Sequence, residues 1–104
     1  MERVAFKMKL SDGYQDEYKK RHDALWPDLE TLLKERGIEE YSIFLDVKTN
    51  DLFGYLKIED QHLLNGLADH PVMKKWWAFM KDIMVTNEDN SPLTLQLREV
   101  FYLP

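Results

Sequence analysis

The stretch YKKRHDALWP, Tyr18 to Pro27, combines a basic run, a histidine, two large aromatic residues and a proline. On a helix, Tyr18 and His22 lie one above the other on the same face, because they are four positions apart. Pro27 lacks a backbone N–H and disfavours helical geometry at Trp26. We therefore expect one helix to end or kink near Asp23 to Trp26, and a second helix to begin with Pro27 in its first turn. A helix break with a histidine beside aromatic side chains is a candidate place for chemistry.

Outside this stretch, the pattern of apolar residues predicts the element order βαββαβ. Residues 3–10 alternate between apolar and polar side chains, as a half-buried strand does. Two further runs, separated by the polar turn 48–51, predict a hairpin, and Gly54 in its second strand marks a bulge or a close approach of the backbone. The expected strands are 3–10, 38–46, 52–58 and 95–103, and the expected helices are 14–22, 27 to a cap at Gly37, 60–67 and 72–84.

This order is the ferredoxin-like pattern of the α+β class, in which an antiparallel sheet carries its helices on one face. A chain of 104 residues fits one domain, residues 1–104. The other face of the sheet is too apolar to be left in water, because both faces of the later strands carry aromatic residues. A second copy of the sheet is the simplest cover, so we expect a homodimer.

The composition excludes several classes of protein. A formal net charge of -5 argues against nucleic acid as a partner. The chain has no cysteine, which excludes disulfides, thiolate metal sites and a cysteine nucleophile. Its apolar runs are too short to span a membrane, and its first residues do not resemble a signal peptide. We expect a soluble, cytoplasmic protein.

His22 is the first candidate for chemistry. Histidine titrates near neutral pH without help and so serves as a general acid or base. Tyr18, one turn away, has a hydroxyl that can hold a ligand or orient the imidazole ring. The alternative is an ordinary surface histidine on a charged helix, and the spacing alone leaves both interpretations open.

Trp76, Trp77 and Tyr41 are further candidates. Adjacent helical residues point about 100° apart, so the two tryptophans do not serve the same buried stripe. One of them belongs to the core; the other lies at a dimer interface or lines a pocket, where an indole face suits the C–H face of a sugar. Tyr41, on an apolar strand face, is either a core tyrosine or a ligand-facing hydroxyl between sheet and helix.

Other common sites find no support in the sequence. His62 and His70 are not spaced with each other or with His22 as metal ligands, so we expect no metal site. The glycine patterns of nucleotide-binding loops and the nucleophile elbow of serine hydrolases do not occur. The sequence therefore carries no nucleotide-binding signal.

Several blocks of the chain together resemble the L-rhamnose mutarotase family. The resemblance extends over essentially the whole chain, in order and without large gaps. Its most specific parts are the RHxxxWP block with a following acidic residue and leucine, the tryptophan pair and the terminal block. The matching segments are YKKRHDALWPDL, GIEEYSIFLD, KKWWAFM, DNSP and EVFYLP.

The resemblance implies a cytoplasmic homodimer with a dimeric α+β-barrel fold. The implied activity is the interconversion of the α and β anomers of L-rhamnose without a cofactor. The family's proton donor falls on His22, and its substrate-binding positions fall on Tyr18, Tyr41, Trp76 and Trp77.

The chemistry of mutarotation agrees with these residues. The pyranose ring opens when an acid protonates the ring oxygen and a base takes the proton of the anomeric hydroxyl; a positioned acid–base group contributes about 10²–10⁴-fold. We expect His22 to be the acid, Tyr18 and Tyr41 to hold hydroxyls, and one tryptophan to stack on the sugar. The base is a second group, a water, or His22 acting in turn.

Two other functions fit the same pattern. A small cofactor-free oxygenase of the dimeric α+β-barrel type would also use a histidine and tryptophans, but its pocket should be mostly apolar. A non-catalytic sugar-binding module would bind sugar whether or not His22 is present.

Overall fold

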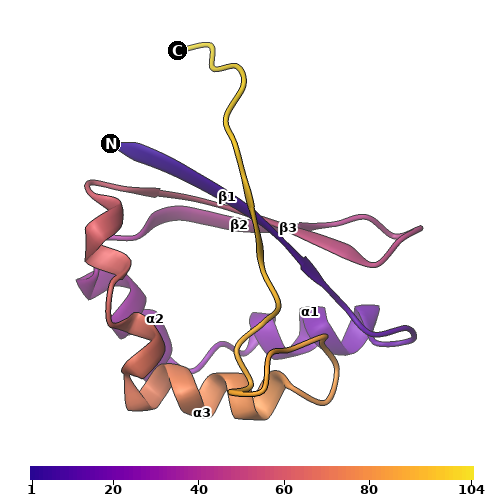
Figure 1. Cartoon of the computed structure of the whole chain (residues 1–104). Helices are drawn as coiled ribbons and strands as arrows, with labels where there is room; N and C mark the ends of the chain where they lie inside the picture. Colours follow the sequence, from indigo (N-terminus) through magenta and orange to yellow (C-terminus); the bar gives the residue numbers. More distant parts are fainter.

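The computed structural model describes residues 1–104 and confirms the predicted βαββαβ order. One four-stranded antiparallel sheet, in the order β2-β3-β1-β4, lies against the helices on one face (Figure 1). This strand order is that of the ferredoxin-like fold. The elements are β1 (Glu2–Lys9), α1 (Gln15–Asp23), α2 (Pro27–Glu35), β2 (Glu39–Leu45), β3 (Asp51–Ile58), the 3₁₀ helices η1 (Gln61–Leu64) and η2 (Leu67–Asp69), α3 (Pro71–Met80) and β4 (Leu95–Leu97).

The alternation in the first strand determines which side of the sheet is buried. Val4, Met8 and Leu10 lie under the helices with at most 8% of their surface exposed, and Phe6 is half-buried on the same face. Opposite Val4, Phe6 and Met8 on β3 stands a residue of the same face, such as Leu52 against Met8. The core therefore lies between the sheet and the helical layer.

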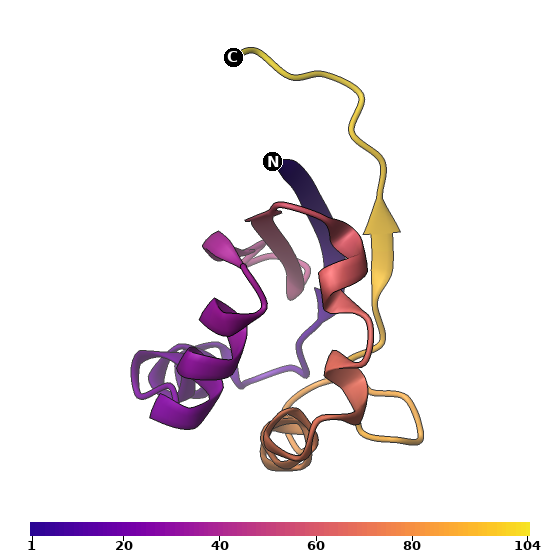
Figure 2. The same cartoon turned by 90° about the vertical axis from the view of Figure 1, so that its left-hand side faces the viewer.

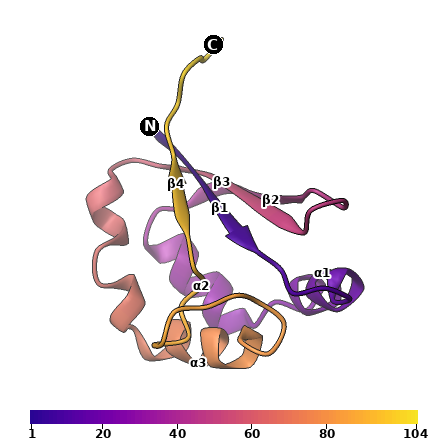
Figure 3. The ribbon, with the colours of Figure 1, turned by 45° about the vertical axis from the view of Figure 1, so that its right-hand side comes forward.

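The helix break falls where the sequence predicts it. α1 ends at Asp23, and the N–H of Leu25 bonds to the carbonyl of His22 at 3.2 Å in a closing turn. Trp26 is extended, with φ -61° and ψ 132°, as a residue before proline prefers. Pro27 then opens α2. The break lets α1 and α2 run in different directions beneath the sheet (Figure 3).

Two predicted helices differ from the structure. In place of the one helix predicted over 60–67, the chain forms two short 3₁₀ helices over 61–64 and 67–69, because Gly66 adopts the left-handed conformation with φ 81° and separates them. α3 ends at Met80 rather than at Met84. Ile83 and Met84 are buried, so they continue the apolar pattern, but Met84 pairs with Leu10 in an isolated bridge at the end of β1.

The last strand is shorter than predicted. β4 pairs with β1 only over Leu95–Leu97, and residues 98–104 have no regular structure. This C-terminal segment extends beyond the sheet (Figures 1 and 3). Its residues Val100, Phe101 and Leu103 are each at least 77% exposed. The alternation of apolar residues continues through the segment, but no strand lies beside it to accept its hydrogen bonds.

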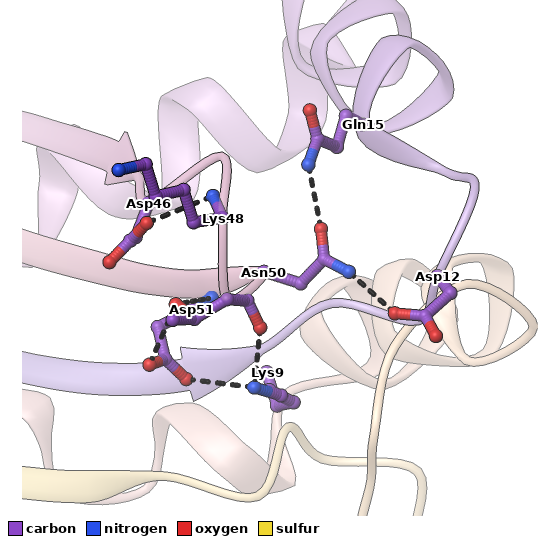
Figure 4. Close-up of polar contacts among 8 residues, drawn as sticks. Lys9, Asp12, Gln15, Asp46, Lys48, Asn50 and Asp51 are labelled. Carbon is purple, nitrogen blue, oxygen red and sulfur yellow. Dashed lines mark hydrogen bonds and ion pairs between the residues drawn. The ribbon is translucent and has the colours of Figure 1, made fainter.

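A polar network ties the β2–β3 turn to the start of α1 (Figure 4). The side chain of Asn50 donates to Asp12 at 2.6 Å and accepts from Gln15 at 2.7 Å. The backbone carbonyl of Asn50 accepts a hydrogen bond from the backbone N–H of Leu10 at 2.9 Å. Asn50 has φ 65°, a conformation that asparagine tolerates better than most residues. The network fixes the N-terminal end of the helix that carries His22.

The face of the sheet away from the helices carries exposed apolar side chains, as the sequence predicts, interspersed with basic residues such as Lys7 and Lys57. The paired register places Phe44 beside Phe53, and Ala5 beside both Tyr55 and Leu97, all on this face. Phe44 is 68% exposed. We call this set, together with Leu95, the outer face.

Candidate active site

A cavity of about 610 Å³ lies between the sheet and the helical layer. Its walls come from the inner faces of all four strands, from α2 and α3, from His22 at the end of α1, and from the η2 segment. In Figure 2, α2 (purple) and the η1–η2 segment (rose) lie on either side beneath the strands. Sixteen of the 23 lining residues are hydrophobic, so the few polar groups decide what the cavity binds.

His22 is held in one orientation at the edge of this cavity. Its Nδ1 lies 3.0 Å from the carbonyl oxygen of Tyr18, one turn earlier in α1. A carbonyl only accepts, so Nδ1 carries a hydrogen and donates it. The imidazole ring stacks on the Tyr18 ring at 4.2 Å and meets the Trp76 ring edge-on at 5.4 Å. These contacts leave Nε2 without a hydrogen-bond partner in the protein. No buried side-chain nitrogen or oxygen lacks such a partner, so Nε2 is not buried and is accessible.

The surroundings of His22 favour the neutral imidazole. Burial lowers the pKa of His22 below 6.5, because the charged form loses hydration; the Tyr18 carbonyl and the nearby Asp23 oppose this shift more weakly. With Nδ1 protonated, neutral Nε2 has a free lone pair. At neutral pH the cavity therefore contains a base that becomes an acid once it has taken a proton.

Tyr18 lies beside His22 and does not line the cavity. Its side chain is buried, with 8% of its surface exposed, yet its hydroxyl oxygen has no protein partner and is therefore accessible. Burial raises the pKa of Tyr18 well above 10.0, and the nearby Tyr41 raises it further. The two phenols predicted from the sequence are thus brought near each other, and Tyr18 remains protonated at neutral pH.

Tyr41 lines the cavity from β2, next to an irregularity that the sequence does not reveal. The pairing of β2 with β3 shifts by one residue between Glu39 and Ser42, and Glu40 has φ 51°. Such a bulge redirects side chains locally. The Tyr41 ring meets Phe6 edge-on at 6.2 Å. The side chain as a whole is 39% exposed, but desolvation around its hydroxyl raises the pKa of Tyr41 to about 12.

Both tryptophans of the predicted pair line the cavity from α3. Trp76 is 5% exposed and packs edge-on against Trp26 at 5.1 Å, besides its contact with His22. Trp77 is half-buried. The pair therefore divides as expected into a core residue and a more accessible one.

Arg21 joins α1 to the end of α3 beside the histidine. Its guanidinium makes two bonds to the Asp82 carboxylate, at 2.9 and 3.2 Å, and donates to the Phe79 carbonyl at 2.8 Å. It also bonds Glu17 at 2.7 Å. These bonds fix the distance between the helix that carries His22 and the helix that carries the tryptophans.

The arrangement suits a small, neutral, polyhydroxylated ligand. It offers one accessible imidazole nitrogen and phenol groups that stay protonated, and its walls are largely aromatic or aliphatic. Hydroxyls can bond to the phenols and the imidazole, while the C–H face of a ring lies on apolar walls. None of the helices is long and apolar enough to cross a membrane.

Comparison with known proteins identifies the family. The sequence model described as L-rhamnose mutarotase matches residues 3–103. The chain belongs to the L-rhamnose mutarotase family. The L-rhamnose mutarotase of Brucella anthropi is 53% identical over 103 residues, covering 99% of this chain and 97% of the relative. That of Listeria monocytogenes is 52% identical, with 99% of both chains covered.

A solved mutarotase structure has the same fold. The crystal structure of L-rhamnose mutarotase from Formosa agariphila superposes with a TM-score of 0.93 at 52% sequence identity, over 100% of both chains. Family membership and the ferredoxin-like fold, both predicted from the sequence, are thereby confirmed.

Some residues of the mutarotase cavity were not identified from the sequence. Phe6, Thr94 and Gln96 line it. Phe6 pairs with Gly54 on one side and with Gln96 on the other, so the three form one row across the inner face. Gln96 could have been noticed as the one polar residue between Leu95 and Leu97, which point to the outer face.

Proposed function

We propose that this chain interconverts the α and β anomers of L-rhamnose, with His22 carrying the proton. The observation that carries the proposal is the free Nε2 of a neutral, fixed imidazole at a cavity of a mutarotase family member. Tyr41 holds a sugar hydroxyl as a donor from the cavity wall. Tyr18, whose accessible hydroxyl lies near Tyr41 but outside the cavity lining, is the second proposed donor, and both phenols stay protonated. They therefore do not serve as bases at neutral pH.

His22 acts first as base and then as acid. Neutral Nε2 takes the proton of the anomeric hydroxyl, the bond between C1 and the ring oxygen breaks, and its electron pair leaves with that oxygen. Protonated Nε2 returns the proton to the ring oxygen, which yields the open aldehyde. After rotation about the C1–C2 bond the same steps run in reverse on the other face, so no net proton is consumed.

The other ionisable groups of the cavity are poorer candidates for the base. Glu30 pairs with Lys34 at 3.3 Å, and Glu40 pairs with Lys57 at 2.7 Å. Each carboxylate is more than half exposed, so it is hydrated as well as paired. This supports His22 acting in turn, one of the three options for the base that the sequence leaves open.

Trp77 is the indole that we propose lies against the sugar. Trp76 is almost completely buried, and its ring already packs against Trp26, His22 and Phe79. Trp77 also lines the cavity but retains more exposed surface. A flat aromatic face suits the C–H face of the pyranose.

We further propose that the protein is a homodimer joined through the outer face. Phe44, Phe53 and Leu97 are 68%, 37% and 38% exposed there, which is costly in water. The exposed C-terminal segment adds further apolar surface next to β4, at the edge of the sheet.

The cytoplasmic location stays a prediction.

The alternatives are not favoured. An oxygenase of aromatic compounds has no use for several fixed hydroxyl donors, and the relatives with more than half of their residues identical are named mutarotases.

Polarimetry of freshly dissolved α-L-rhamnose tests the proposal. The rate at which the optical rotation reaches its equilibrium value should increase in proportion to the protein concentration. An unchanged rate, together with oxygen uptake on an aromatic substrate, would contradict it.

A further inference from the structure

Gly54 stands at the centre of the sheet, directly opposite Phe6 in the pairing of β1 with β3. Residues paired in this way point to the same face, here the face that lines the cavity. A Cβ added to Gly54 would lie less than 3.0 Å from three outer carbons of the Phe6 ring. The ring therefore covers the backbone of Gly54 and occupies the space of a side chain, as aromatic residues do over glycine in sheets.

The position of this ring affects the width of the cavity. Phe6 forms part of the sheet-side wall, across from His22 and Trp77 in the helical layer. Its edge-to-face contact with Tyr41 also supports a residue that we propose binds substrate. A ring that lies against the sheet leaves room above it, whereas a tilted ring enters that room.

We propose that Gly54 is a positioning residue of this enzyme: by having no side chain, it lets Phe6 lie against the sheet and keeps the cavity wide enough for a pyranose ring. The inference rests on the proposed function and concerns which sugars fit. Gly54 is not required for backbone geometry, because its φ is not among the positive values of the chain. Alanine is therefore tolerated by the backbone, and the displaced group is the outer end of a movable side chain.

Gly54→Ala should tilt the Phe6 ring away from the sheet into the cavity. We expect the dissociation constant for L-rhamnose, followed by tryptophan fluorescence, to rise about tenfold, because the tilted ring takes space that the sugar needs. KM should rise with it, while kcat changes less, because His22 is untouched. L-lyxose, which has the same ring configuration without the methyl group, should lose less affinity because it is smaller.

Phe6→Leu in the Gly54→Ala background should restore most of the L-rhamnose affinity, since leucine lacks the outer ring carbons that meet the added methyl. A general loss of stability would instead weaken the binding of both sugars equally. If Gly54→Ala does not fold, Phe6→Trp enlarges the ring above an unchanged Gly54. It should produce the same size-dependent loss.

The wild-type protein is measured alongside. If it accelerates anomerisation but Gly54→Ala keeps wild-type affinity, or loses affinity equally for both sugars, the inference about Gly54 is wrong while the proposed function stands. If the wild-type protein neither binds L-rhamnose nor accelerates its anomerisation, the proposed function fails first.

Discussion

At the scale of single residues, the state of His22 determines the chemistry. The Tyr18 carbonyl holds the hydrogen on Nδ1, and burial keeps the ring neutral. The sequence predicted His22 and Tyr18 as partners from their helical spacing alone. It could not predict that the partner atom is the backbone carbonyl rather than the hydroxyl, because the rotamer of His22 depends on packing against Trp76.

The pH dependence of the reaction follows from this state. Burial lowers the pKa of His22 below 6.5, so the neutral base dominates at pH 7. We expect kcat/KM to stay constant from neutral pH down to that lowered pKa and to fall only below it. NMR exchange rates between the anomers across this range check the profile, with the His22→Ala rate subtracted as background. A rate that rises as pH falls from neutral would mean that the protonated ring starts the reaction.

At the scale of elements, the position of α1 depends on its two ends. Asn50 fixes the start of the helix through Asp12 and Gln15, and Arg21 fixes its end to the segment after α3. The break between α1 and α2 was predictable, because proline constrains its neighbours locally. The ends of α3 and β4 were not predictable from the sequence. The apolar pattern continues through Met84 and beyond Leu97, and whether it forms helix or strand there depends on the neighbouring strands.

Loss of the Asn50 side chain should loosen the start of α1. Asn50→Ala removes two hydrogen bonds and places alanine at φ 65°. We expect the free energy of unfolding to fall by about 1–3 kcal/mol. Urea denaturation measures the change. Asn87→Ala is the matched control. The Asn87 side chain bonds only within its own exposed loop, so the free energy of unfolding of that variant should fall by less. Equal losses in the two variants would show that the link to α1 contributes nothing.

At the scale of the whole molecule, the sheet has two apolar faces, of which only one is covered. The inner face of the sheet is covered by helices and leaves a cavity, whereas the outer face is open. The order of elements and the existence of an apolar outer face were both predictable, because they follow from alternation along the strands. The cavity was not, because its walls depend on the Phe6–Gly54 contact and on the bulge before Ser42.

The proposed dimer can be tested by placing a charge on the outer face. Phe53 lies on β3, in the middle of the sheet, and is 37% exposed. Phe53→Glu should convert a dimer into a monomer in sedimentation-velocity experiments, because a carboxylate would replace the apolar ring and lose its hydration in the interface, a cost that Lys7 opposite it on β1 offsets only in part. Tyr14→Glu, at a similarly exposed aromatic residue before α1, should stay dimeric. A wild-type protein that sediments as a monomer at all concentrations would contradict the dimer.

The central claim is that His22 moves the proton that opens the ring of L-rhamnose. Saturation-transfer NMR at anomeric equilibrium tests it most directly, because it measures α–β exchange without a net reaction. We predict faster exchange with the wild-type protein, a loss of about 10²–10⁴-fold of the enzymatic rate in His22→Ala, and a wild-type rate in His62→Ala, which removes an exposed histidine. Near-full exchange with folded His22→Ala would contradict the account.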